Sequence, residues 1–176
     1  MSEQQKPMRK QNRLKQFSYD NCGAYFITIC TKERKNLFWQ NLVFNESQIE
    51  KPVGATIGRP QKQALTHYGR IVEKVFLDIP KHYPMVSVDK HVVMPNHLHM
   101  ILTINSNDSG RPMVAPTISN IVQQTKGVAT KMAGCEIFQK SFYDHVIRNQ
   151  QDYDNIWQYI DTNPLRWCDD ELFFED

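Results

Sequence analysis

The stretch VSVDKHVVMPNHLHMILTI, residues 86–104, contains two runs rich in β-branched and apolar residues with a proline and an asparagine between them. Residues 86–93 and residues 97–104 each predict a strand. Pro95 and Asn96 are typical of a tight turn, because proline restricts φ and asparagine tolerates turn conformations. The stretch therefore predicts a β-hairpin at the centre of a largely antiparallel sheet.

The regions on both sides of this hairpin alternate between strand and helix patterns. The expected elements are a strand at 25–33, a helix at 64–82, a helix at 117–133, a strand at 136–147 and a helix at 152–163. Thr117 or Ser119 is expected to cap the second helix, Gly134 to end it, and Asp152 to cap the last helix. This order of elements is the split βαββαβ pattern of an α+β sandwich, followed by a terminal helix.

Size and composition fit one globular domain. The chain has 176 residues, of which 40% are apolar and 23% are charged, as is ordinary for a folded protein. No run approaches the roughly 18 apolar residues of a membrane helix, and the first 15 residues lack the apolar centre of a signal peptide. None of the four cysteines lies in a Cys-x-x-Cys motif, so we expect reduced thiols in a cytosol.

Charge is distributed unevenly, although the formal net charge is only +2. Residues 1–15 contain five basic residues and one acidic residue, whereas residues 169–176 contain five acidic residues and no basic one. We therefore expect a basic N-terminal arm at 1–17, a single domain at 18–168 and an acidic tail at 169–176. The tail is interpreted as a solvated, frayed end.

Two polar segments, 45–63 and 105–116, interrupt this plan and are expected to be surface loops. They contain the peptides VGATIGRP at 53–60 and GRPMVAPT at 110–117. Codons for the first peptide can be written so that their reverse complement, with the reading frame shifted by one base, encodes the second peptide. An eight-residue match of this kind would be rare by chance. We infer an inverted DNA repeat across the two loops, which the nucleotide sequence of the gene would test.

The hairpin carries the strongest candidate for chemistry, the motif MPNHLH at 94–99. Because alternate residues of a strand face the same way, His97 and His99 project two imidazoles from one face of the sheet. Two neutral imidazoles form half of a divalent-metal site. Taken alone, a His-x-His pair is as compatible with a structural pair as with a metal site.

A second candidate lies in the last expected helix, in the motif WQYIDTNP at 157–164. Tyr159 and Asn163 are four residues apart and share one helix face, which places a phenol beside a carboxamide. The alternative is a buried tyrosine followed by a C-capping asparagine before Pro164. Out of context, that alternative is the commoner arrangement.

Together with a third motif, these residues resemble a known family. The motifs VVMPNHLH (92–99), FYDHVIR (142–148) and YIDTNP (159–164) are similar in order and spacing to those of the single-tyrosine HUH transposases. The branch that they resemble most is that of the REP-associated tyrosine transposases. The resemblance spans roughly residues 18–168. The inferred inverted repeat agrees with it, because this branch processes palindromes.

The resemblance implies a ferredoxin-like fold and a role for each motif residue. Tyr159 matches the nucleophile, and His97, His99 and Asn163 match the ligands of a divalent ion, Mg²⁺ or Mn²⁺. The implied reaction is cleavage and rejoining of single-stranded DNA at hairpin-forming palindromes through a 5′-phosphotyrosine link. One alternative is a catalytically silent hairpin-binding protein. Another is a metal hydrolase of small phosphoesters. The hydrolase lacks support, because two-metal sites usually use Asp and Glu ligands, whereas the ligands implied here are two histidines and an asparagine.

Other residues are weaker candidates for catalysis or DNA binding. Tyr143 and Tyr153 are rival nucleophiles, but neither precedes an amide by one helical turn. His91 and His145 could approach the site without an assignable role. The candidate phosphate contacts are Arg9, Lys10, Arg13 and Lys15 in the arm, Lys126 and Lys131 in the second helix, and Arg148. The expected location is the bacterial cytoplasm at the nucleoid, and both a monomer and a homodimer remain open.

Overall fold

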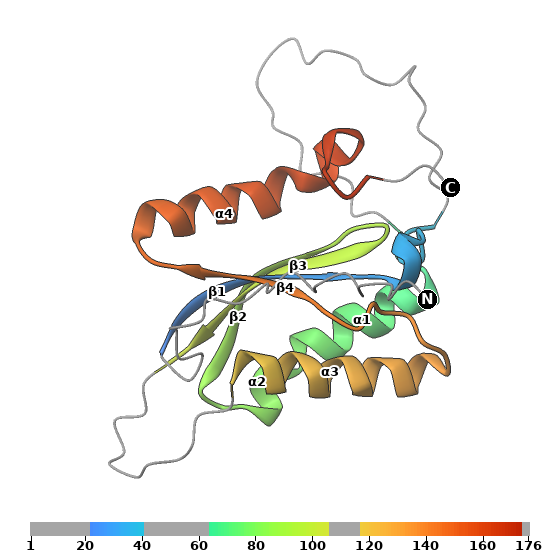
Figure 1. The fold of residues 1–176 in the computed structure, drawn as a ribbon, viewed down its shortest axis with the longest axis horizontal. Coiled ribbons are helices and arrows are strands. Elements are labelled where there is room, and N and C mark those ends of the chain that lie inside the picture. The colour runs from blue at the N-terminus through green and yellow to red at the C-terminus, as the bar shows by residue number, and fades with distance from the viewer. Residues whose placement is uncertain (1–21, 41–63, 106–116, 174–176) are drawn as a thin grey trace, which may run out of the picture.

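A computed structural model describes residues 22–40, 64–105 and 117–173 of the chain. Its centre is a four-stranded sheet in which all neighbouring strands are antiparallel. In the order in which they pair, the strands are β2 (Val86–Val93), β3 (His97–Ile104), β1 (Gly23–Cys30) and β4 (Tyr143–Ile147) (Figure 1). The predicted α+β fold and the predicted bounds of the hairpin are therefore confirmed.

Helices cover both faces of this sheet (Figure 1). On one face lie α1 (His67–Leu77), α2 (Ile79–His82) and α3 (Ile118–Ala133), and on the other face lies α4 (Gln150–Thr162). Two 3-10 segments, η1 (Lys32–Arg34) and η3 (Asn163–Asp169), follow β1 and α4. Within the described ranges, every helix is too short or too polar to cross a membrane.

The two ends of α3 are capped by residues that the sequence predicts. The Thr117 hydroxyl accepts a hydrogen bond from the backbone N–H of Asn120, 3.2 Å away, and so satisfies one of the free donors of the first turn. Gly134 ends the helix at φ 71°, a left-handed conformation that glycine adopts without a Cβ clash. These local contacts explain why the predicted bounds of α3 are confirmed.

Four other predicted elements have wrong bounds. The strand expected at 25–33 spans Gly23–Cys30 and is followed by η1. The helix expected at 64–82 divides at Asp78 into α1 and α2, because Pro80 has no N–H to continue the hydrogen-bond ladder. The strand expected at 136–147 begins only at Tyr143. The last helix begins before Asp152, because the side chain of Asn149 caps it and accepts a hydrogen bond from the Asp152 N–H at 2.9 Å.

The main hydrophobic core lies between the sheet and the layer formed by α1, α2 and α3. Alternate residues of the two central strands face it because side chains alternate along a strand. The core residues of these strands are Tyr25, Ile27 and Ile29 in β1 and Leu98, Met100, Leu102 and Ile104 in β3. Removal of these side chains from water is the main stabilising contribution to this half of the molecule.

The opposite face of the sheet is covered by α4 and is more polar. Within α4 the only buried residue is Ile160. Among the strand residues between the core positions, Thr28, His97 and His99 are buried beneath this helix. This arrangement positions polar side chains in a protected space between the sheet and α4.

Candidate active site

The two histidines of the hairpin lie side by side beneath α4. His97 begins β3 and His99 follows two residues later, so both imidazoles leave the same face of the strand. Their ring centroids are 4.3 Å apart, and both side chains are buried. The prediction that the two imidazoles project together is confirmed.

Asn96 determines which nitrogen of His97 carries the proton. The Asn96 amide nitrogen donates to the backbone carbonyls of Arg34 at 3.2 Å and Leu172 at 2.8 Å. Its oxygen is therefore the acceptor that faces Nδ1 of His97, 2.8 Å away, so Nδ1 carries the hydrogen. The lone pair of His97 lies on Nε2, a buried atom without a hydrogen-bond partner among the described residues.

His99 is held in a similar way by a residue of the neighbouring strand. Its Nδ1 lies 2.8 Å from the hydroxyl of Thr28, the residue opposite it on β1. Its Nε2 points toward the Tyr159 hydroxyl, 3.3 Å away. In the tautomer with hydrogen on Nδ1, which then donates to Thr28, Nε2 directs its lone pair to the same space as His97 Nε2.

Both imidazoles are neutral in this environment. Burial, together with a smaller contribution from the positive charge of Arg34, lowers the pKa of His97 from 6.5 to about 3. Burial, and then the neighbouring His97, lowers the pKa of His99 well below 6.5. Neutral imidazole is the form that binds metal ions.

Tyr159 projects from α4 toward these histidines. Its side chain is 42% exposed, and its hydroxyl lies 3.2 Å from Oδ2 of Asp170. Burial of the hydroxyl raises its pKa to about 12, with a further contribution from the negative charge of Asp170. The phenol is therefore protonated at neutral pH and needs an acceptor for its proton in order to react as a nucleophile.

Asn163 lies one helical turn after Tyr159 and forms the C-cap of α4. Its amide nitrogen donates to Oδ2 of Asp170 at 2.6 Å. Its side-chain oxygen is buried and has no hydrogen-bond partner within the described part of the chain. The predicted proximity of Tyr159 and Asn163 on one helix face is thus seen, and Asn163 is both a cap and a candidate ligand.

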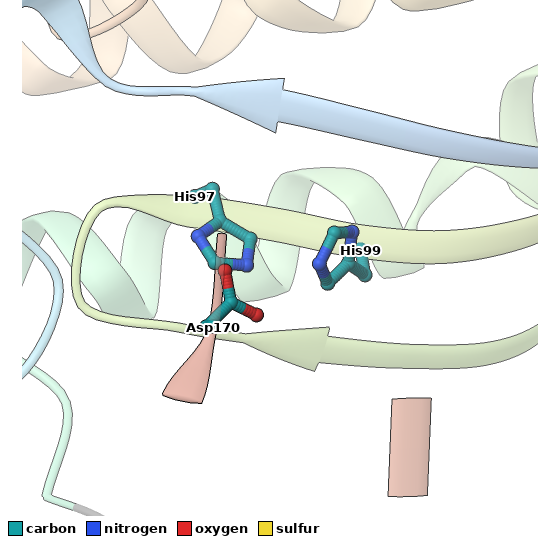
Figure 2. Close-up of side chains that lie close together, drawn as sticks. All are labelled: His97, His99 and Asp170. Carbon is teal, nitrogen blue, oxygen red and sulfur yellow. The ribbon is translucent and has the colours of Figure 1, made fainter. Parts of the chain in front are cut away.

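Asp170 is the site residue that sequence reasoning missed. Ligand atoms of His97, His99 and Asp170 all lie within 4.8 Å of one another, and Figure 2 shows the three side chains close together. The interpretation of residues 169–176 as a frayed tail is therefore wrong for Asp170; residues 174–176 lie outside the described residues.

Buried Trp167 explains why this acidic residue is held in place. Its ring packs against His97, Trp39 and Phe173, with centroid distances of 5.9, 6.5 and 5.3 Å. Leu172 adds the hydrogen bond from Asn96. The apolar pair at Trp167 and Phe173 on either side of the acidic run was the sequence signal available for this docking.

The buried donor set fits a divalent cation. Two buried acceptor atoms, His97 Nε2 and Asn163 Oδ1, have no hydrogen-bond partner among the described residues. Such atoms are costly unless something binds them. Imidazole nitrogens together with amide or carboxylate oxygens are ligands that Mn²⁺ and Mg²⁺ accept.

A cavity of about 800 Å³ opens beside these residues. The sheet contributes Phe26, Thr28, Cys30, His99 and Tyr143, and the α4–η3 junction contributes Tyr159, Thr162, Asn163 and Arg166. Arg34 and residues 139, 141, 142 and 169–172 complete the lining. Its volume is in the range of ligand pockets, about 300–1,000 Å³.

Among the described residues, the predicted phosphate contacts Lys126, Lys131 and Arg148 do not line this cavity. Lys126 donates its ammonium hydrogens to the backbone carbonyls of Gln139, Lys140 and Ser141, which indicates a structural role. Lys131 is also on α3, which lies across the sheet from α4 (Figure 1). Arg148 follows β4, and its backbone N–H faces Asp152. Arg9, Lys10, Arg13 and Lys15 lie outside the described residues.

The rival tyrosine and histidines have other partners. The Tyr153 hydroxyl donates to Asp89, 3.1 Å away, and burial and this carboxylate raise its pKa to about 12. His91 faces Glu73 of α1 at 3.7 Å, and His145 bonds Asp152 at 2.9 Å. Among the tyrosines named from the sequence, Tyr159 is the one with a hydroxyl in contact with the histidine pair.

The chain resembles several known proteins in sequence. It is 33% identical to an uncharacterized protein of Haemophilus influenzae, over 95% of this chain and 94% of that protein. It is 27% identical to a REP-associated tyrosine transposase of Escherichia coli, over 60% of each protein, so it spans less than two thirds of that relative's length. No protein-family model matches the chain.

A solved structure shares the fold. It contains a REP-associated tyrosine transposase bound to a REP hairpin. The similarity has a TM-score of 0.54 and 21% sequence identity, and it covers 95% of this chain and 74% of that one. At this level of identity, the likeness demonstrates the common α+β architecture.

Proposed function

Because the chain belongs to the REP-associated tyrosine transposase-like family, we propose that it is a metal-dependent nuclease and strand transferase for single-stranded DNA at hairpin-forming palindromes. The observation that carries this proposal is the 3.3 Å contact between the Tyr159 hydroxyl and Nε2 of His99, beside a second buried imidazole. In this position a tyrosine can reach a phosphate that is bound at the histidine pair.

The cation would be held by Nε2 of His97 and of His99, with an oxygen of Asn163 or Asp170 as a third ligand. A bound Mg²⁺ or Mn²⁺ would neutralise charge on the phosphodiester and orient it. The contacts of the two Nδ1 atoms with the side chains of Asn96 and Thr28 hold both rings in the orientation that ligation requires.

Tyr159 would attack the phosphorus, and the 3′-oxygen would leave with the bonding electron pair. The DNA would then remain joined to the Tyr159 oxygen by its 5′-phosphate. Because the phenol pKa is about 12, the proton has to leave during the attack, and Asp170 Oδ2 is an acceptor at 3.2 Å. A free 3′-hydroxyl can later reverse the step, because the phosphotyrosine link conserves the energy of the broken bond.

The wider DNA contacts are also part of this proposal. We assign the basic arm at 1–17, which includes Arg9, Lys10, Arg13 and Lys15, to the phosphates of the hairpin stem. An enzyme acting on palindromes of the chromosome would work in the bacterial cytoplasm at the nucleoid.

A covalent adduct between protein and DNA tests the proposed reaction. The protein would be incubated with Mn²⁺ and a hairpin oligonucleotide that carries single-stranded flanks and a label on the side 3′ to the cut. We expect a labelled band of the size of the protein on a denaturing gel. Tyr159→Phe should abolish this band, because it removes the attacking oxygen and keeps the ring.

Tyr153→Phe is the matched control, because this tyrosine lies on the same helix and its hydroxyl bonds Asp89 instead of the histidine pair. It should retain the adduct. An adduct that survives in Tyr159→Phe would contradict the nucleophile assignment. Tight hairpin binding by the wild-type protein with no adduct under Mg²⁺ or Mn²⁺ would favour a hairpin-binding protein that does not cut.

A further inference from the structure

Tyr143 lies in the same row of side chains as the histidine site. On the sheet, His99 of β3 is opposite Thr28 of β1, and Thr28 is opposite Tyr143 of β4. Directly opposed residues of neighbouring strands project from the same face. Because neighbouring strands lie about 4.8 Å apart, the Tyr143 backbone is about 10 Å from that of His99.

The side chain of Tyr143 is accessible to solvent. It is 53% exposed, although it lies at the first residue of β4 and lines the cavity that contains Tyr159. β4 is an edge strand, so among the described residues no further strand of the sheet lies beyond this ring. Phe26 also lines the cavity, and its ring packs beside those of His99 and Tyr159.

The groups around this aromatic end match a nucleotide. Gln139 and Ser141 of the preceding segment line the same wall and can hydrogen-bond the edge of a base. Arg34 lines the cavity as well and can contact a phosphate. Exposed aromatic rings beside cationic side chains are the pattern by which proteins bind unpaired bases without strong sequence preference.

We propose that Tyr143 is the stacking platform for an unpaired nucleobase of the DNA strand that is cut, close to the scissile phosphate. This inference rests on the proposed function of the same cavity and adds a nucleobase subsite to it. Tyr143 thus has a binding role in place of the role of rival nucleophile. Tyr143 and Tyr159 both line this cavity, which has a volume of about 800 Å³.

Equilibrium binding in the Tyr159→Phe background tests the subsite without any cleavage. The probe is a labelled hairpin with single-stranded flanks, and the affinity is measured by fluorescence anisotropy at fixed salt. Tyr143→Leu, which keeps an apolar strand residue but removes the aromatic ring, should weaken binding about tenfold. Tyr143→Phe should bind like the parent, because stacking needs the ring and not the hydroxyl.

The matched control is Leu165→Ala. Leu165 is 67% exposed and is not among the residues that line the cavity, so its loss should leave affinity unchanged. Circular dichroism and melting temperature would establish that all variants are folded. If Tyr143→Leu binds with the affinity of its parent, the subsite does not exist.

Abasic probes locate the stacked base. Single abasic sites are placed in turn along the flank of the probe, and one position should weaken binding by the parent protein about as much as Tyr143→Leu does. At that position, the abasic site should cause no further loss of affinity in Tyr143→Leu, because both changes remove the same stacking interaction. Equal losses at every position in both proteins would overturn the proposal.

The proposed function and the subsite can fail separately. If the subsite behaves as expected while the wild-type protein forms no Tyr159 adduct, the catalytic proposal fails and the cavity is a binding site only. If the adduct forms while Tyr143→Leu binds and reacts normally, the reaction stands and the base is held elsewhere.

Discussion

At the scale of single residues, Asn96 connects three parts of the site. It is buried, it accepts a hydrogen bond from His97 Nδ1, and it donates to the carbonyls of Arg34 and Leu172. Arg34 has φ 57°, a left-handed conformation that costs a non-glycine residue about 1–3 kcal/mol. The side-chain amide of Asn96 therefore stabilises the strained turn at Arg34, fixes the tautomer of His97 and anchors the segment after Asp170.

We expect Asn96→Ala to weaken Mn²⁺ binding about 10- to 100-fold, because residues that orient metal-binding histidines typically contribute this much. Isothermal titration calorimetry of Mn²⁺ into the folded protein measures it. Asn155→Ala, which removes an exposed asparagine of α4, should leave the affinity unchanged. An unaltered affinity in folded Asn96→Ala would show that the His97 tautomer does not depend on this contact.

At the scale of elements, α4 is held on the sheet by polar contacts. Its only buried residue is Ile160. Lys90 of β2 pairs with Asp161 and lies over the ring of Trp157, 4.9 Å from its centroid. At the other end of the helix, Tyr153 bonds Asp89 and Asp152 bonds His145. Of these contacts, the Lys90–Asp161 pair lies two residues from Tyr159, so it is the one tied most directly to the position of Tyr159 relative to His99.

Lys90→Ala should therefore slow adduct formation by about tenfold, because small displacements of a reacting group are costly. Hairpin affinity should stay within about twofold, and stability should fall by less than about 1 kcal/mol, because exposed ion pairs contribute little. Single-turnover rates, anisotropy and thermal melting measure the three quantities. Lys90→Arg should recover much of the rate.

Lys81→Ala is a matched control, since Lys81 pairs with Asp78 across the sheet from α4. It should leave the adduct rate unchanged. A parallel loss of affinity and rate in Lys90→Ala would indicate a DNA contact, and an unchanged rate would show that α4 does not need this pair.

At the scale of the whole molecule, the two faces of the sheet have different tasks. The face covered by α1, α2 and α3 carries the large apolar core, whereas the face covered by α4 buries two neutral histidines beside the cavity. Burial of the histidines in the neutral form links the stability of the fold to pH, because the unfolded chain takes up protons that the folded chain does not.

The pKa of His97 falls from 6.5 to about 3 on folding, and that of His99 falls as well. Below pH 6.5 the unfolded state binds more protons, so stability is full above pH 6.5 and is lost as pH falls toward 3. In EDTA, the free energy of unfolding should fall between pH 6.5 and 4.5 by up to about 1.4 kcal/mol per pH unit for each histidine. Urea denaturation at several pH values measures the slope.

His97→Gln should reduce this slope, whereas Asn155→Ala, which removes no titratable group, should not. A slope that is identical in wild type and His97→Gln would contradict neutral burial of this residue.

Much of the fold and half of the site follow from local patterns. The hairpin was predicted to the residue because its strand alternation and its Pro95–Asn96 turn are encoded within nineteen adjacent positions. The pairing of His97 with His99 follows from the strand period of two, and that of Tyr159 with Asn163 from the helical period of 3.6. Where the pattern failed, at Pro80 and Asn149, a local hydrogen-bond requirement outweighed apolar spacing.

The sequence by itself therefore determined the α+β class, the hairpin and two separate pairs of chemical groups. Only the tertiary structure decided that these pairs meet, because sheet order β2-β3-β1-β4 and the docking of α4 bring residues 60 positions apart into contact. It also decided that Asp170 joins them and that Tyr143 lies in their row. The burial of Trp167 holds Asp170 in place, and strand pairing places Tyr143 beside the site. Both depend on contacts between residues distant in sequence, so no periodic spacing in the sequence reveals them.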